Sequence, residues 1–227
     1  MAAIDRAVAI LVALETAREP LTLAELAAAT RMYKSTLLRI LTSLRNANLV
    51  QRRADQRYAL GHFALSLGRA FEATHHVEAS VMPAMEWLIS QGSESPSFHV
   101  RHDGRARLCL FRLDSGHSTL DRVRAGDLLP MARGAPGKVL MAFAKGVESA
   151  DGAPLICTSF GERDPSCAAV SVPVFGPDGD LVGALSLSGP LERFNEIAVK
   201  KMSKILLSAA QTATHSLGGP WPERFAS

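Results

Sequence analysis

The sequence predicts an α+β protein in two parts, with helices at the N-terminus and an antiparallel sheet in the C-terminal part. Up to about residue 44 the apolar residues recur every three or four positions, whereas beyond residue 97 they recur with a period of two. Positive charge is also unevenly spread: residues 1–76 hold ten Lys and Arg against six Asp and Glu, and the remaining residues hold fifteen against sixteen. We therefore expect a basic helical domain followed by a nearly neutral sheet domain.

Three short helices are expected at the N-terminus. The first covers residues 4 to about 18. Thr22 and Glu25 have the spacing of a capping box, so a second helix starts there and runs through Ala29. After a break of four residues a third helix is expected, with the buried stripe Leu37, Ile40, Leu41 and Leu44.

A basic β-hairpin is predicted next, with strands at residues 49–53 and 57–60. A short helix, a tight break, a second helix and a basic hairpin are the parts of a winged helix-turn-helix, in which the last helix enters the major groove of DNA. We therefore predict a DNA-binding domain over residues 1–60. Its candidate contact residues are Arg31, Lys34, Ser35, Thr36, Arg39, Arg52, Arg53 and Arg57.

Different contacts are expected from these side chains. Ser35 and Thr36 are small enough to let the helix approach the groove, and Arg39 is long enough to reach the acceptors of guanine. Lys34 and the arginines of the hairpin are expected to contact the phosphate backbone or minor groove. Two alternatives remain open, that Ser35 and Thr36 cap the helix and that the basic cluster is an ordinary solvated face.

A connecting helix is expected over residues 61–76. Its apolar face has no core of its own, so a second subunit could cover it and make a homodimer, or it could pack against the hairpin. Residues 77–227 are predicted to form a layered α+β domain with helices at 77–91, 137–144 and 196–216 and strands at 97–102, 105–113, 118–123, 169–175 and 181–187.

The sequence lacks the motifs of several kinds of site. Cys109, Cys157 and Cys167 are odd in number and lack C-x-x-C spacing, so neither disulfides nor a zinc site is expected. Residues 134–138 fail the phosphate-binding loop pattern, and no hydrolase, metalloprotease or dinucleotide-binding motif is present. His75 and His76 would diverge on a helix and make poor joint metal ligands. We expect no catalytic residue, no metal and no cofactor.

No stretch of the sequence is long and apolar enough for a membrane span, so we expect a cytoplasmic protein. Two further classes stay open beside a ligand-controlled DNA-binding regulator. One is an enzyme that transforms a small molecule and uses its N-terminal helices for assembly. The other is a regulator whose C-terminal domain is purely structural.

The order of several motifs resembles the IclR family of bacterial transcriptional regulators, over nearly the whole chain. The motifs are IDRAVAIL from residue 4, LTLAELAAAT from 21, YKSTLLRIL from 33, RYALG from 57, GKVLMAFA from 137, GERDPSCAAVSVPVFGPDG from 161 and ALSLSGP from 184. The resemblance implies a winged helix domain, a linker helix and a GAF-like effector-binding domain, assembled as a homodimer or homotetramer on double-stranded DNA.

The resemblance also implies a small-molecule effector, commonly an organic or aromatic acid, bound between the sheet and the loop before the helix at residue 137. By motif this points to the main chain near Ala135 and to Ser186 and Ser188, which alternate onto one face of their strand. Their hydroxyls could instead bond local backbone. Further lining residues, unless they belong to the core, are Phe98, Cys109, Met131, Cys157 and Cys167.

Two positions depart from the family pattern. Arg31 stands where relatives often place glycine, which would cost on the order of 1 kcal/mol if a left-handed backbone is kept there. A contact between Arg31 and a DNA phosphate would offset this cost. Pro136 stands where relatives often present a backbone N–H to the ligand, and proline has no such donor.

Overall fold

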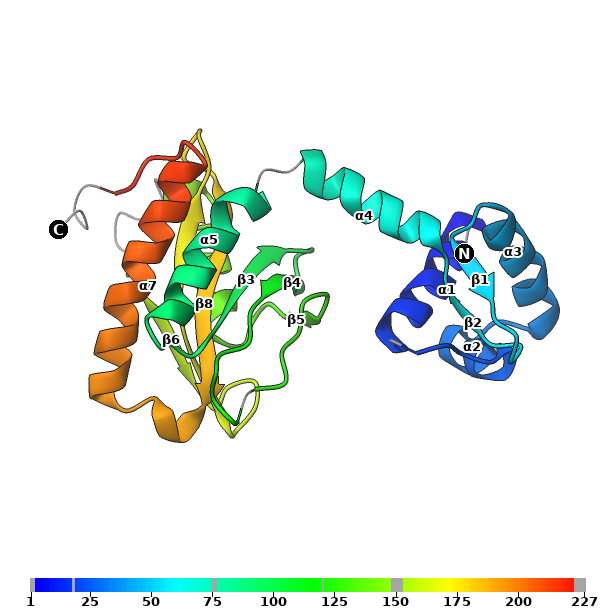
Figure 1. The fold of residues 1–227 in the computed structure, drawn as a ribbon, viewed down its shortest axis with the longest axis horizontal. Coiled ribbons are helices and arrows are strands. Elements are labelled where there is room, and N and C mark those ends of the chain that lie inside the picture. The colour runs from blue at the N-terminus through cyan, green and yellow to red at the C-terminus, as the bar shows by residue number, and fades with distance from the viewer. Residues whose placement is uncertain (1–2, 18, 75–76, 120, 148–152, 223–227) are drawn as a thin grey trace. The chain divides into compact units, whose positions relative to one another are not determined.

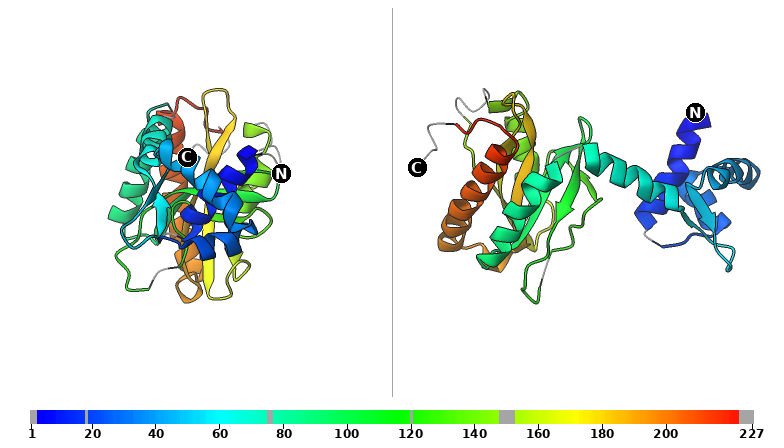
Figure 2. Two further views of the ribbon diagram at one scale, coloured as in Figure 1. Left: turned by 90° about the vertical axis from the view of Figure 1, so that its right-hand side faces the viewer. Right: turned by 45° about the horizontal axis from the view of Figure 1, so that its top comes forward.

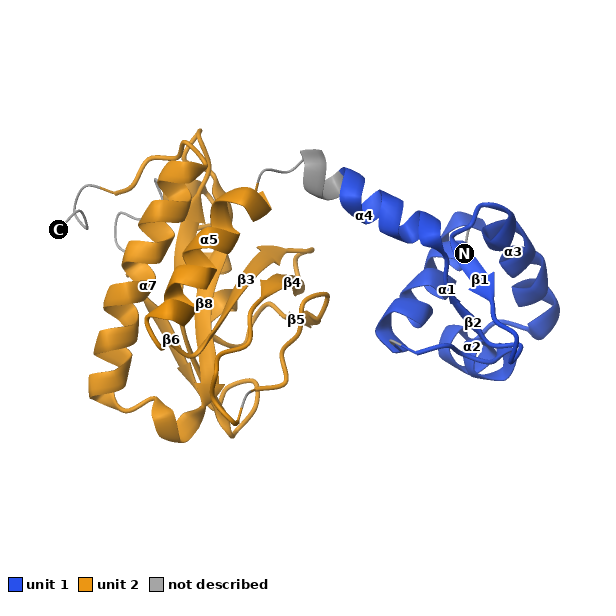
Figure 3. Cartoon of the chain, viewed as in Figure 1, with its two compact units in different colours: residues 1–75 blue, residues 76–227 orange. Residues whose placement is uncertain are grey.

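The computed structural model describes residues 3–17, 19–74, 77–119, 121–147 and 153–222. The chain divides into two compact units, residues 1–75 and 76–227 (Figure 3). His75 and His76, considered above as metal ligands, lie outside the described residues. None of the described helices combines the length and the apolar character needed to cross a membrane.

The first unit contains the three expected helices, α1 (Ala3–Ala17), α2 (Leu23–Thr30) and α3 (Lys34–Asn46) (Figure 1). Each helix contributes a buried apolar stripe to one core, because its apolar residues recur at helical spacing. This core is made of Ile10, Leu14, Leu26, Leu37, Leu41, Leu44, Val50 and Tyr58. The predicted helices are confirmed, with ends that differ by one or two residues.

The capping box predicted for α2 is present. The hydroxyl of Thr22 accepts the backbone N–H of Glu25 at 3.2 Å, and the carboxylate of Glu25 accepts the backbone N–H of Thr22 at 2.6 Å. Two of the N–H groups that a helix start leaves without partners are thereby satisfied. These bonds also lower the pKa of the Glu25 carboxyl group.

Arg31 ends α2 in the left-handed conformation, with φ 54° and ψ 32°. A left-handed geometry that glycine adopts easily is therefore kept here by a residue with a side chain. The side chain of Arg31 is exposed. The strain at this position is thus not offset by contacts within the domain core.

The hairpin consists of β1 (Val50–Arg52) and β2 (Tyr58–Leu60), paired antiparallel with Val50 opposite Leu60. Leu21 extends it, because Leu21 and Tyr58 exchange backbone hydrogen bonds of 2.9 and 2.7 Å. Gly61 follows in a position that only glycine fits: an added Cβ would lie 2.1 Å from the carbonyl oxygen of Asn48.

The connecting helix predicted from the sequence is α4 (His62–Thr74), which belongs to the first unit. Three of its apolar side chains stay open to solvent in this unit: Phe63 is 42% exposed, Leu65 60% and Leu67 50%. Much of this apolar face is therefore uncovered.

The second unit is built on a six-stranded antiparallel sheet in the order β5-β4-β3-β8-β7-β6. The expected α+β class is confirmed. The strands are β3 (Ser95–Arg101), β4 (Ala106–Arg112), β5 (Leu128–Pro130), β6 (Cys157–Phe160), β7 (Cys167–Phe175) and β8 (Leu181–Pro190).

One predicted strand is wrong. The described part of residues 118–123 is a loop, and the edge of the sheet is formed by β5 instead. The apolar alternation of this segment misled the prediction, because Asp121 turns inward to an arginine of β4 rather than taking a place in a strand. Neither β5 nor the short strand β6 was predicted.

Helices α5 (Val77–Ser90) and α7 (Glu196–Ser216) lie side by side on one face of the sheet (Figures 1 and 2). The helix α6 (Ala135–Ala142) packs on β7 and β8 from the other face and starts two residues earlier than predicted. The expected cap of α7 is confirmed, since Asn195 Oδ1 accepts the backbone N–H of Ala198 at 2.9 Å.

The two faces of β8 differ in character. Leu185 and Leu187 join the core beneath α5 and α7, whereas Ser186 and Ser188 face the opposite side. On β3, Phe98 enters the same core, and its neighbours Ser97 and His99 share the serine side. A polar surface therefore runs across the centre of the sheet, opposite the two long helices.

The strained turn gives a first prediction. Arg31→Gly should raise the free energy of unfolding of residues 1–75 by up to about 1 kcal/mol, because glycine adopts the left-handed conformation without a Cβ penalty. Arg31→Ala keeps the strain and serves as the control, and chemical denaturation measures both. No gain for glycine over alanine would contradict the assignment of strain.

Candidate nucleic-acid interface and ligand cavity

The solvent side of α3 presents a basic, small-residue surface. Lys34, Ser35 and Arg39 are exposed and Thr36 is half-buried, while Leu37 anchors the helix in the core. Among the described residues, neither Lys34 nor Arg39 has an ion-pair partner. These side chains are thus free to meet a polyanion.

The alternative that Ser35 and Thr36 cap α3 is not observed. The N-cap is Tyr33, and its side chain makes no capping hydrogen bond. Ser35 and Thr36 occupy the second and third helical positions, where a hydroxyl cannot play the N-cap role. Tyr33 itself is 86% exposed at this end of α3.

The three hairpin arginines differ in their contacts. Arg53 is exposed, and the guanidinium of Arg52 lies 5.7 Å from the ring centre of Tyr58. Arg57 Nη1 donates to the carbonyl of Pro20 at 2.9 Å and to Glu25 Oε2 at 3.2 Å. Arg57 therefore ties the hairpin to α2, while its side chain stays 40% exposed, and its contact with DNA remains a prediction.

The distribution of charge along the sequence did not reveal the pair of Arg57 and Glu25. Between residues 31 and 57 the only acidic side chain is Asp55, so all the arginines there look uncompensated. Glu25 is brought beside Arg57 only by the packing of α2 on the hairpin. The free basic surface is consequently smaller than the sequence suggests.

The second unit contains a small cavity on the polar face of its sheet. Three of the predicted effector residues line it: Cys167, Ser186 and Ser188. The other lining residues are His99, Arg107, Asp121, Val123, Leu129, Gly134, Pro136, Ser159, Arg163, Asp164, Ala168 and Ala169.

Five predicted lining residues are absent from the cavity lining. Phe98 belongs to the core beneath α5 and α7, and Met131 to the core around α6. Cys109 and Ala135 are fully buried and outside the cavity lining. Cys157 packs against the core around α6. Core packing, the alternative left open by the sequence, describes these residues.

The two serine hydroxyls have partners as well as cavity exposure. Ser186 donates to the carbonyl of Val170 at 3.1 Å, and Ser188 accepts from Arg112 Nη1 at 3.3 Å. A hydroxyl can donate one hydrogen bond and accept others, so each retains capacity for a ligand.

Arg107 was missed by sequence reasoning and is the largest fully buried side chain of the cavity wall. Its Nη1 donates to the carbonyls of Pro130 and Arg133, while its Nε has no hydrogen-bond partner among the described residues. Burial, with a smaller effect of the nearby Arg163, lowers the pKa of Arg107 to about 10. The group is still a cation at neutral pH.

His99 is the second missed residue. Its side chain is almost completely buried, its Nε2 lies 3.0 Å from Ser97 Oγ, and its Nδ1 has no partner in the described part of the chain. Burial first, and then the charges of Arg107, Arg112 and Arg163, hold the pKa of His99 well below its usual value. The ring is therefore neutral at neutral pH. Alternation of polar and apolar residues along β3 was the signal that could have found it.

The first turn of α6 is engaged by the chain itself. The backbone N–H of Gly134 donates to Glu162 Oε2 at 3.2 Å, and Lys138 Nζ bonds both Glu162 and the carbonyl of Thr158. Pro136 contributes no donor. Gly134 and Pro136, on either side of Ala135, line the cavity, so a ligand contact with the main chain near Ala135 remains a prediction.

Close packing fixes this arrangement. A Cβ on Gly137 would lie 2.0 Å from the carbonyl oxygen of Met131, and a Cβ on Gly134 would lie 3.3 Å from Arg107 Nη2. Small residues at these places let the guanidinium of Arg107 lie against the start of α6. The described residues hold no cluster of three or more His, Cys, Asp or Glu suited to a metal ion.

Comparisons with known proteins agree with this geometry. The IclR helix-turn-helix domain family matches residues 3–54. The regulator KipR of Bacillus subtilis, an HTH-type transcriptional regulator, is 22% identical over 87% of this chain and 90% of its own.

Solved structures resemble the full chain. An IclR-type transcriptional regulator from a Silicibacter species is 20% identical, with a TM-score of 0.80 and complete coverage of both chains. An IclR homologue from Microbacterium hydrocarbonoxydans, complexed with 4-hydroxybenzoate, is 20% identical, with a TM-score of 0.81 over 95% of this chain and 99% of that one. These similarities show the fold.

The helix-turn-helix and its matches define a DNA-binding transcriptional regulator. More narrowly, residues 3–54 match the IclR helix-turn-helix domain family, and the order of the sequence motifs resembles that family over nearly the whole chain.

The contacts of Arg57 give a second prediction. Arg57→Ala should lower the free energy of unfolding of the first unit by about 1 kcal/mol, the contribution of a typical hydrogen bond to a carbonyl. Arg53→Ala should leave stability unchanged and weaken DNA binding at all sequences alike, with a smaller salt dependence. Denaturation and binding at several salt concentrations measure the two effects, and a reversed pattern would refute the assignment.

The environment of His99 gives a third prediction. Because its pKa is lowered in the folded state, its contribution to stability is complete above about pH 6.5, the usual value for histidine, and is lost as pH falls below it. There the unfolded chain binds a proton that the folded chain does not, at up to about 1.4 kcal/mol per pH unit. His99→Gln should reduce this slope in denaturation at pH 5–8, and His102→Gln, at an exposed position, should preserve it.

Proposed function

We propose that this chain binds specific DNA sequences as a homodimer or homotetramer, and that a small organic acid in the cavity of the second unit modulates this binding. Residues 1–60 act as the winged DNA-binding domain, 61–76 as the linker helix and 77–227 as the GAF-like effector-binding domain. The observation that carries the effector part is the buried guanidinium of Arg107 on the cavity wall.

For DNA recognition, α3 enters the major groove. Arg39 reads a guanine edge, Ser35 and Thr36 allow close approach, and Lys34 holds a phosphate. Arg31, Arg52 and Arg53 contact the backbone. Arg57 acts through the hairpin, which it holds against α2.

For effector recognition, the cavity offers two cations without a carboxylate partner among the described residues, Arg107 and Arg163. A buried cation without such a partner stabilises a bound anion strongly, because desolvation has already weakened its contact with water. Ser186 and Ser188 supply hydroxyls on the same wall. The bound 4-hydroxybenzoate of the Microbacterium homologue supports an acid of this kind.

For assembly, the exposed apolar residues of α4 favour a second copy of the chain as partner. The DNA-binding domains of the two copies would then contact two half-sites on the DNA. An effector that changes the relative placement of these domains would change DNA affinity. Such a regulator acts where its DNA is, in the cytoplasm.

We propose no catalytic activity. The Ser97–His99 pair has a completely buried hydroxyl outside the cavity lining, and burial raises the pKa of the Cys109 thiol to about 12. Neither group is a ready nucleophile at neutral pH. The alternative of a small-molecule-transforming enzyme would be favoured only by measured turnover that survives deletion of residues 1–60.

The DNA-binding function is tested by gel-shift titration on the DNA that flanks its own gene. Arg39→Ala should weaken binding to the specific site by about 1–3 kcal/mol and relax the preference at one base pair. Arg69→Ala on α4, another exposed arginine, is the matched control and should bind as wild type. Equal weakening of Arg39→Ala on all sequences would make Arg39 a phosphate contact.

Effector binding is tested by thermal shift, because a ligand that binds the native state must raise its stability. Organic and aromatic acids should raise the unfolding temperature and change the gel-shift affinity together. An acid that shifts neither property at millimolar concentration, across both classes, would contradict the proposal and favour a structural C-terminal domain.

A further inference from the structure

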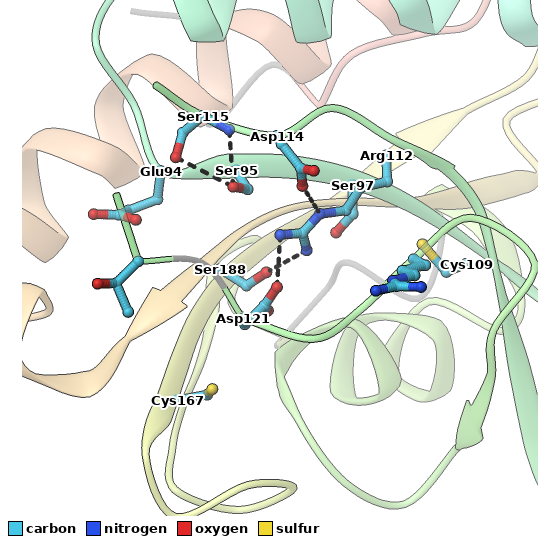
Figure 4. Close-up of polar contacts among 12 residues, drawn as sticks. Glu94, Ser95, Ser97, Cys109, Arg112, Asp114, Ser115, Asp121, Cys167 and Ser188 are labelled. Carbon is cyan, nitrogen blue, oxygen red and sulfur yellow. Dashed lines mark hydrogen bonds and ion pairs between the residues drawn. The ribbon is translucent and has the colours of Figure 1, made fainter. Parts of the chain in front are cut away.

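The cavity wall contains a buried ion pair that the anchoring of an acid does not use. Arg112 Nη2 of β4 lies 2.6 Å from Asp121 Oδ1 of the loop before β5, and Arg112 also bonds Asp114 and Ser188 (Figure 4). The side chain of Arg112 is 5% exposed and that of Asp121 only 1%. Asp121 lines the cavity, whereas Asp114 is 64% exposed and lies outside the lining.

The hydrogen-bonding capacity of Asp121 is unfilled. Its Oδ2 has no partner among the described residues, and its Oδ1 faces Arg112 without hydrogen-bond geometry. A buried carboxylate oxygen without a donor costs about 1–3 kcal/mol or more, so such atoms are rare outside functional sites.

The loop that carries Asp121 is held in place by bonds on both sides. The backbone N–H of Ser115 donates to Ser95 Oγ at 3.0 Å, and Arg193 Nη2 donates to the carbonyl of Thr119 at 2.8 Å. After Asp121, the N–H of Arg124 donates to Asp127 at 2.7 Å. The chain itself therefore fixes the place of Asp121 in the cavity wall.

We propose that Asp121 Oδ2 accepts a hydrogen bond from a hydroxyl of the effector, whose acid group is held by Arg107 and Arg163. The effector class is thus a hydroxylated monocarboxylic acid, and Asp121 is the residue that discriminates it from the acid without the hydroxyl. This inference rests on the proposed effector function and narrows its ligand.

The charges around the cavity favour a hydroxyl over an ammonium group as the donor. Arg112 already neutralises Asp121, and the carboxylate of Asp164 is engaged by the backbone N–H and hydroxyl of Ser166. Arg107 and Arg163 then remain as cations on the wall. An added positive charge would meet repulsion here, whereas one negative charge is compensated.

His99 provides a second polar group on the same cavity wall that can hydrogen-bond a ligand. Its ring is neutral, and the unpaired Nδ1 can donate or accept depending on its tautomer. It can therefore bond a hydroxyl or a carboxylate without a change of charge.

The test compares matched acids on the wild-type chain by isothermal titration calorimetry. The pairs are propionate with 3-hydroxypropionate and benzoate with 3- and 4-hydroxybenzoate, and 3-aminopropionate tests the ammonium alternative. At least one hydroxy acid should bind about 10-fold or more tightly than its partner, because a site built around a charged acceptor rejects a ligand that leaves it unpaired. Equal binding of every pair, or preference for the amino acid, would overturn the proposal.

The variants locate the discrimination. Asp121→Ala should reduce the ratio of affinities for the preferred pair to about one, Asp121→Asn should retain part of it through its carbonyl, and Asp114→Asn, the control at the other partner of Arg112, should leave it unchanged. Equal loss of affinity for both members of the pair would show a structural role and overturn the proposal. The wild-type comparison decides the matter even if Asp121→Ala does not fold.

Failure of this inference differs from failure of the proposed function. Acids that bind and alter the gel shift without any preference for the hydroxyl refute the role of Asp121 alone. Absence of binding by all these acids, together with no effect on DNA affinity, refutes both.

Discussion

The register of β8 between β3 and β7 determines which side chains the second unit buries and which it offers to a ligand. Ser186 pairs with Ser97 on one side and with Ser171 on the other, so serine stands opposite serine across three strands. Leu185 and Leu187 consequently point to α5 and α7. A shift by one residue would place the serines in the apolar core and the leucines in the cavity, so burial of one face specifies the other.

With this register, buried charged side chains lie in and beside the cavity wall. Arg107 and Arg112 both come from β4, at the side of β3. Arg107 is stabilised by backbone carbonyls and Arg112 by carboxylates and a hydroxyl, which are two different ways of satisfying a desolvated guanidinium. The first leaves the positive charge uncompensated and suited to an anion. The second leaves a carboxylate oxygen unused and suited to a donor.

The first unit follows a simpler physical rule. Its helices bury one stripe each, and the groups left on the outside of α3 are those suited to DNA. The strained Arg31 keeps the turn that this arrangement needs, and Arg57 fastens the hairpin to α2. The charge of the domain is therefore divided between residues that hold the fold and residues that remain free for phosphate.

The sequence by itself determined the helices, the hairpin and the long central strands, because these depend on local periodicity and capping. It determined that Ser186 and Ser188 share a face, since alternation along a strand is local. Only the tertiary structure decided that the described part of residues 118–123 forms a loop, that Glu25 meets Arg57, and that Phe98 lies in the core while His99 faces the cavity. Arg107, Arg112 and Asp121 are far from Ser186 and Ser188 in sequence, and strand pairing and loop anchoring bring them together. Contacts of that kind follow from packing, which no short stretch of sequence encodes.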